Sequence, residues 1–146
     1  MTDDELMALA RDAAGLSPDP NTQTGAAILT AEGAIYTGRN DLPPNVDRRP
    51  ERLERPAKYD WLCHAEVSAI ADAAKNGSAT YGATMALTWY PCLPCAHAMV
   101  RAKIKRLVCV PARMDDPRYT FAGATEVLLA NGVEIVERSI LREEGK

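Results

Sequence analysis

Two short segments constrain the fold of this 146-residue chain more than any other feature. Residues 64–66 read His-Ala-Glu, and residues 91–95 read Pro-Cys-Leu-Pro-Cys. Zinc takes imidazole and thiolate ligands, and a catalytic zinc ion keeps three protein ligands and one open position. His64, Cys92 and Cys95 supply such a set. We therefore expect a fold that brings the two segments together around one ion.

Glu66 is the wrong residue type for a sulfur-rich structural zinc site, so we expect it to move protons. A zinc ion with an open position lowers the pKa of its water from 15.7 toward about 7. Glu66 would accept a proton from that water. The pattern thus predicts a zinc ion that activates water, with Glu66 as the catalytic residue.

Two other interpretations of the cysteines stay open. A Cys-x-x-Cys pair alone is also typical of redox proteins, although the upstream His-x-Glu and the preceding Pro91 disfavour that interpretation. A structural zinc ion needs a fourth ligand to complete its tetrahedron. The spare candidates are Cys63, Cys109 and His97, which we interpret as a buried thiol, a core residue and a packed or surface histidine.

Both segments match the signature of the zinc-dependent cytidine deaminase superfamily. More of the chain resembles its deoxycytidylate (dCMP) deaminase-like branch. Residues 21–28, Asn-Thr-Gln-Thr-Gly-Ala-Ala-Ile, resemble the first strand of that branch, and residues 38–43 resemble its substrate-binding turn. The resemblance runs from about residue 17 to residue 136. It implies a three-layer α/β cytidine deaminase-like fold, a mixed five-stranded sheet with helices on both faces and zinc between two helix ends.

The resemblance also assigns residues to substrate binding. It implies that Asn40 hydrogen bonds the sugar or the base edge, and that the backbone of Ala65 donates to the base edge. Trp89 or Tyr90 would stack on a flat ring, with core packing as the alternative for both residues. Ser68 departs from the branch, which often has asparagine two residues after the catalytic glutamate.

Strand and helix patterns alternate along the chain. Apolar periodicity, caps and turn residues predict a helix capped by Thr2 that runs to about residue 14, helices over 63–75 and 122–130, and a loop followed by a helix within 91–102. They predict strands over 26–30, 34–37, 83–88, 107–111 and 133–137. This order favours an α/β layer fold whose later strands run parallel, built as a single deaminase domain over residues 1–146. The charged tail from Ser139 is expected to be loose or helical.

Residues 39–59 form a long, polar, proline-rich stretch without an apolar period. Loops of this length inside a domain are usually functional or disordered. For most of its charged residues we expect plain solvation, with a helical turn near residues 49–55. Arg39, Arg48 and Arg49 are the candidates for a phosphate or carboxylate clamp at the mouth of the site, because guanidinium groups suit planar anion recognition.

Charge and composition limit the partners. A net charge of -3 and a single phenylalanine argue against nucleic acid, which needs a positive footprint and aromatic platforms. No apolar run reaches the length of a membrane helix, and the acidic N-terminus lacks an apolar signal core. With a Cys-x-x-Cys motif in an unexported chain, we expect a cytoplasmic protein. The resemblance implies a homo-oligomer, from dimer to hexamer.

The leading hypothesis is a zinc-dependent hydrolytic deaminase of a small amino-heterocycle, namely a pyrimidine deoxynucleotide (dCMP to dUMP, releasing ammonia). The alternatives within the same chemistry are a free base, a nucleoside, a purine or a triazine. A tRNA adenosine deaminase and a non-catalytic zinc module are the alternatives from other classes. One catalytic zinc ion is the expected cofactor, and a small molecule is the expected partner.

Overall fold

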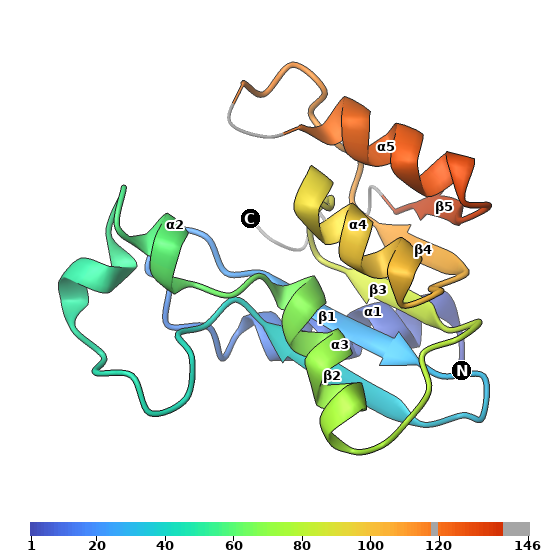
Figure 1. The fold of residues 1–146 in the computed structure, drawn as a ribbon, viewed down its shortest axis with the longest axis horizontal. Coiled ribbons are helices and arrows are strands. Elements are labelled where there is room, and N and C mark those ends of the chain that lie inside the picture. The colour runs from blue at the N-terminus through green and yellow to red at the C-terminus, as the bar shows by residue number, and fades with distance from the viewer. Residues whose placement is uncertain (118–119, 139–146) are drawn as a thin grey trace.

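A five-stranded sheet organises residues 1–117 and 120–138, the part of the chain that the computed structural model describes (Figure 1). Its strands are β1 (Gly25–Leu29), β2 (Ile35–Arg39), β3 (Thr84–Leu87), β4 (Arg106–Cys109) and β5 (Glu134–Glu137), in the order β2-β1-β3-β4-β5. β1 runs antiparallel to β2 and β3, whereas β3, β4 and β5 are parallel. The predicted mixed sheet with parallel later strands is confirmed. The predicted tail from Ser139 lies outside the described residues.

Helix α1 (Asp3–Ala14) begins with a capping box. The Thr2 hydroxyl accepts from the Glu5 N–H at 3.1 Å, and the Glu5 carboxylate accepts from the Thr2 N–H at 3.3 Å. These bonds satisfy amides that a helix N-terminus otherwise leaves unpaired. α1 covers one face of the sheet and packs on its central strands. The cluster consists of Leu6, Met7, Ala10, Ala27, Ala86 and Val108.

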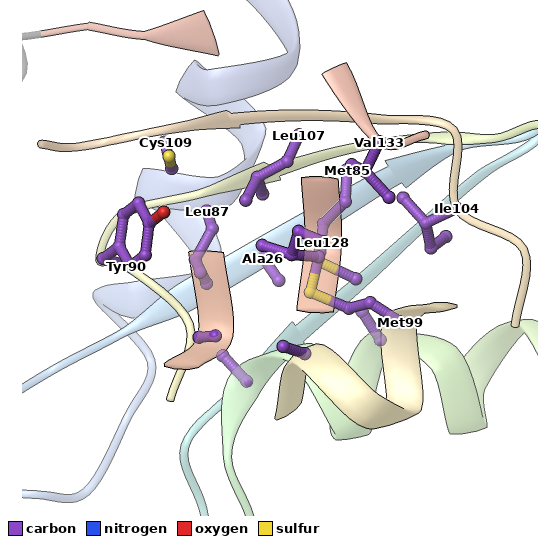
Figure 2. Packing of buried hydrophobic residues seen from close by; sticks show 14 of the residues in the cluster. Ala26, Met85, Leu87, Tyr90, Met99, Ile104, Leu107, Cys109, Leu128 and Val133 are labelled. Carbon is purple, nitrogen blue, oxygen red and sulfur yellow. The ribbon is translucent and has the colours of Figure 1, made fainter. Parts of the chain in front are cut away.

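Helices α3 (Ala65–Lys75), α4 (Leu93–Arg101) and α5 (Phe121–Ala130) cover the opposite face. Side chains alternate along a strand, so the neighbours of the residues that face α1 turn to this second cluster. Figure 2 shows part of its packing, including Ala26, Met85, Leu87, Met99, Leu107 and Leu128. Helices on both faces make the three layers that the resemblance implies.

The chain between β2 and α3 is more structured than a solvated loop. It holds a 3₁₀ helix, η1 (Pro50–Leu53), where a helical turn was expected, and a short helix α2 (Lys58–Trp61) that the sequence did not predict. The helix expected from Cys63 begins two residues later, at Ala65. Cys63 is held in an extended bridge with Asp41, through backbone hydrogen bonds of 2.8 and 3.2 Å. This bridge delays the helix and joins the two ends of the segment.

Glycine at position 38 allows α3 to lie directly against β2. A Cβ atom built on Gly38 would overlap the α3 backbone and come within 2.6 Å of the Ala65 carbonyl oxygen. Non-bonded carbon contacts are favourable only near 3.5–4.0 Å. The missing side chain therefore sets how closely α3 approaches the sheet, and with it the position of His64 and Glu66 at the start of that helix.

We expect Gly38→Ala to lower the free energy of unfolding by about 1–3 kcal/mol, because the added methyl group must displace the α3 backbone. Gly123→Ala is the matched control. Gly123 lies within α5, and a Cβ atom at this position would meet the Leu93 side chain of α4 at an ordinary 3.6 Å. Alanine should stabilise that helix by about 0.5–1 kcal/mol. Chemical denaturation of both variants measures the difference. Equal stability of the two would contradict the close approach at Gly38.

Candidate metal and substrate site

Two helix N-termini hold the three predicted metal ligands. His64 is the N-cap of α3, Cys92 is the N-cap of α4, and Cys95 lies in the first turn of α4. The His64 Nδ1 atom lies 3.2 Å from Cys95 Sγ and 3.5 Å from Cys92 Sγ. The three donor atoms lie within 4.8 Å of one another. The structure thus brings together the set that the sequence singles out.

The residues weighed as a fourth ligand lie outside this group. Cys109 is buried in β4 and contributes to the core. Cys63 is half-buried, and His97 is exposed on α4. Among the described residues, the metal-binding group therefore comprises His64 and two cysteines, which matches a site with an open position better than a closed structural site.

The two thiols of the group differ in acidity. Hydrogen bonds from the Cys95 thiol, from His64 and from the Cys95 backbone lower the pKa of Cys92, although burial opposes them. The bond to Cys92, together with burial and the nearby charge of Glu66, raises the pKa of Cys95. Zinc binds thiolates, so binding would displace the proton that Cys95 keeps. The positive N-terminal ends of two helices favour anionic sulfur here.

Glu66 lies in the first turn of α3 and lines a cavity next to the metal-binding group. Only 5% of the residue is exposed. Burial raises the pKa of Glu66 to about 6, against a backbone hydrogen bond and the charge of His64, which lower it. A carboxyl group that titrates near neutral pH can both accept and release a proton. This environment suits proton transfer.

The cavity has a volume of about 540 Å³, and His64, Cys92 and Glu66 lie in its wall. Sites for small molecules typically measure about 300–1,000 Å³. The rest of the wall comes from the loop before β1, the turn after β2, α2 and the segments next to α4 and α5. These residues are Asp19, Thr22, Thr24, Asn40, Lys58, Tyr59, Leu62, Trp89, Tyr90, Pro94 and Thr120.

Asn40 lines the cavity, but its amide group bonds the protein. Its Oδ1 atom accepts from the Thr24 N–H at 2.8 Å, and its Nδ2 atom donates to the Thr22 carbonyl at 2.8 Å. A longer contact of 3.4 Å joins Nδ2 to Asp19 Oδ2. In this structure Asn40 fixes the loop that precedes β1, and its direct contact with a substrate stays a prediction.

The structure separates the two candidate aromatic residues. Tyr90 is 4% exposed, packs edge-on against Phe121 with ring centroids 5.6 Å apart, and hydrogen bonds Thr125. Trp89 is 38% exposed and also lines the cavity. Core packing therefore describes Tyr90, and Trp89 is the better placed to stack on a ring. Ala65 is buried at the start of α3, outside the described lining, and its N–H belongs to the helix end without intrahelical acceptors.

The structure does not bring the three candidate arginines to the cavity. Arg39 and Arg48 both pair with Asp41, at 3.0 and 2.7 Å, and Arg49 pairs with Asp47 at 2.8 Å. All three side chains are substantially exposed, and the described lining does not include them. Acidic residues of the same loop neutralise these arginines locally. Their exposure and local pairing fit the solvation expected for most charged residues of this segment, and a clamp formed by these three arginines stays a prediction.

Sequence reasoning missed a charged pair inside the cavity. Lys58 and Asp19 are 4% and 2% exposed, and Lys58 Nζ lies 3.1 Å from Asp19 Oδ2. Burial alone would raise the pKa of Asp19, but hydrogen bonds from the backbone of Asn21 and Thr22 and from Lys58 lower it. The two partners are 39 positions apart in the chain, so no local spacing marks them.

A mixed five-stranded sheet with a His-Cys-Cys group between two helix N-termini defines a cytidine deaminase-like zinc protein. Comparison of the sequence with known families agrees. A family model described as the cytidine and deoxycytidylate deaminase zinc-binding region matches residues 1–111. The chain belongs to this family.

Individual relatives fall in one branch of the family. The deoxycytidylate deaminases of Pongo abelii and Homo sapiens are each 33% identical to this chain over 118 residues. The match covers 76% of this chain and 65% of each relative. The chain therefore spans slightly less than two thirds of the length of these enzymes. The resemblance to the dCMP deaminase branch seen in the sequence is confirmed.

Solved structures confirm the fold. The dCMP deaminase of cyanophage S-TIM5 in its apo form has a TM-score of 0.75 at 22% identity, covering 93% of this chain and 96% of the phage chain. The structure of the same phage enzyme in complex with dCMP and dUMP has the same TM-score and identity, covering 92% and 95%. At this identity the likeness establishes the cytidine deaminase-like fold that the sequence predicts.

The donor set fits the expected cofactor. One imidazole nitrogen and two sulfurs are borderline-soft ligands that suit a tetrahedral zinc ion. The family model that matches this chain describes a zinc-binding region. His64, Cys92 and Cys95 would hold the ion, and the adjoining cavity leaves room for a fourth, exchangeable position.

We expect Cys92→Ser and Cys95→Ser each to weaken zinc binding by more than about 100-fold, because losing a group that only orients a ligand already costs about 10- to 100-fold. Cys63→Ser and Cys109→Ser are the matched controls, since both thiols lie outside the group. Titration against a coloured chelator measures the affinity of each variant. Undiminished zinc affinity in either of the first two variants would exclude that cysteine as a ligand.

Proposed function

We propose that this protein is a zinc-dependent hydrolase that removes the amino group of a small amino-heterocycle, and that its substrate is the pyrimidine deoxynucleotide dCMP. The observation that carries the proposal is a buried Glu66 in the cavity wall beside a metal-binding His-Cys-Cys group. The deoxycytidylate deaminases among the relatives support the choice of substrate.

The proposed reaction replaces an amino group by oxygen. A bond forms between C4 of the pyrimidine ring and the oxygen of water, and the bond from C4 to the exocyclic nitrogen breaks. One water is consumed, and one ammonia leaves with dUMP as the other product. When bound, zinc supplies a Lewis acid that lowers the pKa of a water molecule at its open position.

Glu66 moves the protons in this scheme. Its carboxylate accepts one proton of the water and passes it to the ring nitrogen, then accepts the second and passes it to the departing amine. Burial strengthens the interactions of this carboxylate with nearby charge, because little water surrounds it. His64, Cys92 and Cys95 leave Glu66 free of metal ligation, so that the residue can shuttle protons rather than hold the ion.

The shape and polarity of the cavity support a mononucleotide. Its volume of about 540 Å³ falls in the range typical of small-molecule sites. Trp89 and Tyr59 supply aromatic surface against which a flat ring can stack. Hydroxyl groups that can donate to and accept from a sugar come from Thr22, Thr24 and Thr120.

We expect Glu66→Gln to lower kcat by about 100- to 10,000-fold, the range typical of general acid–base catalysis. The zinc content should stay at one ion per chain, because Glu66 is not a ligand in the proposed site. Glu32→Gln, in the exposed turn of the β1–β2 hairpin, is the control and should keep full activity. Ammonia release and metal analysis on the same samples provide the measurement. Turnover that persists in Glu66→Gln would contradict the proposed mechanism.

A substrate panel tests the nucleotide. We expect kcat/KM for dCMP to exceed that for deoxycytidine, cytosine and guanine, because the proposed substrate carries a phosphate that these compounds lack. Ultraviolet absorbance follows loss of the amino group in each case. Equal rates for dCMP and deoxycytidine would replace the nucleotide by a nucleoside, and a preference for guanine would point to a purine.

Two properties of the whole protein complete the proposal. Homo-oligomer formation rests on the family resemblance, and light scattering of the purified protein measures it. The proposed cytoplasmic location rests on the Cys-x-x-Cys motif of Cys92 and Cys95, which favours metal binding over a structural disulfide in a chain that is not exported. Within residues 1–117 and 120–138, every helix is too short or too polar to traverse a lipid bilayer.

A further inference from the structure

The cavity contains few charged groups beyond the metal-binding group and Glu66. Among the described residues of its wall, Asp19 and Lys58 are the remaining charged side chains, and Lys58 is the one lysine or arginine. The arginines expected to bind a phosphate pair with acids outside the wall. An anionic group of a substrate inside this cavity would therefore meet a cation at Lys58.

Lys58 begins α2 and reaches across the cavity wall to the loop before β1. Its Nζ atom lies 3.1 and 3.4 Å from the two carboxylate oxygens of Asp19. Both residues are almost fully buried, so water does little to stabilise either charge and each depends on its partner. An unpaired buried charge has a high energetic cost. The ammonium group of Lys58 is therefore held beside the Asp19 carboxylate.

Asp19 has donors of its own besides Lys58. Its Oδ1 atom accepts from the N–H groups of Asn21 and Thr22 at 2.9 and 3.2 Å, and its Oδ2 atom lies 3.4 Å from Asn40 Nδ2. Two backbone N–H groups and a side-chain amide thus stabilise the negative charge of Asp19. The carboxylate is consequently a fixed anchor whose hydrogen-bonding capacity is largely used within the protein.

The ammonium group of Lys58 has capacity left. It carries three protons, and among the described residues its polar contacts go to the single carboxylate of Asp19. A lysine is a compact point charge well suited to phosphate oxygens. The pair therefore presents a fixed donor to the cavity, while the opposing charge of Asp19 is offset by its other donors.

We infer that Lys58 binds the phosphate of the nucleotide substrate, and that Asp19 is the residue that positions its ammonium group. The inference rests on the proposed function and assigns the residue that distinguishes dCMP from deoxycytidine. The alternative is that the pair only ties α2 to the loop before β1. A tie of that kind would affect both ligands equally, whereas a phosphate contact affects only the ligand that carries a phosphate.

The test compares ligands with and without phosphate on the zinc-loaded protein. We expect Lys58→Met to weaken dUMP binding and to lower kcat/KM for dCMP by about 10- to 100-fold, the usual effect of losing a hydrogen bond to a charged group. Binding of deoxyuridine and turnover of deoxycytidine should change less than about threefold. Calorimetry provides the affinities, so the test does not depend on detectable turnover of the nucleoside.

Matched variants separate phosphate binding from folding. Lys75→Met removes the lysine of an exposed Lys–Asp pair on α3, with Asp72 at 3.2 Å, and should leave both ligands unaffected. The double variant Asp19→Asn with Lys58→Met removes both buried charges. It should recover the thermal stability that Lys58→Met loses, because no buried charge is left unpaired. Its preference for dUMP over deoxyuridine should remain lost.

Three results would overturn the inference. A preference for dUMP that survives Lys58→Met would place the phosphate contact elsewhere while leaving the proposed function intact. Equal losses for dUMP and deoxyuridine, both reversed in the double variant, would reduce the pair to a structural tie. Wild-type protein that binds dUMP and deoxyuridine equally well would remove the nucleotide substrate and the role of Lys58 together.

Discussion

Two helix N-termini meet at one point, and the rest of the site depends on that meeting. The cap of α3 contributes His64, while the cap and first turn of α4 contribute Cys92 and Cys95. The positive ends of both helices favour anionic ligands, and their geometry places Glu66 beside the metal-binding group. α3 can reach this position because Gly38 lets its backbone lie against β2. The chemistry of the site is thus a consequence of how closely a helix packs on the sheet.

Local patterns predicted the parts of the molecule that depend on neighbouring residues. The caps of α1, the hairpin between β1 and β2 and the grouping of His64 with two cysteines follow from short-range spacing, which sequence shows directly. Element ends were less accurate, as the start of α3 shows. There the backbone bridge between Cys63 and Asp41, a contact between distant positions, keeps the chain extended until His64.

Charge in the segment before α3 shows the limit of such reasoning. Composition alone could not tell which basic residue is buried, because that depends on where the carboxylates lie. Asp41 and Asp47 hold the arginines at the surface, whereas Asp19, which belongs to a different loop, draws Lys58 into the cavity. Asn40 is similar: its position in the wall was foreseeable, but its amide bonds to the preceding loop arise only from the folded arrangement.

Glycine residues allow helices to pack closely against both faces of the sheet. Gly25 faces α1 as Gly38 faces α3, and in both places a side chain would collide with a helix backbone. Residues 43–57 are by contrast mostly exposed and lead into α2, whose first residues line the cavity. Mutations in this exposed segment can therefore alter the border of the cavity without touching the packing between helices and sheet that positions the metal ligands. A protein with this architecture can acquire new substrates while its metal ligands remain unchanged.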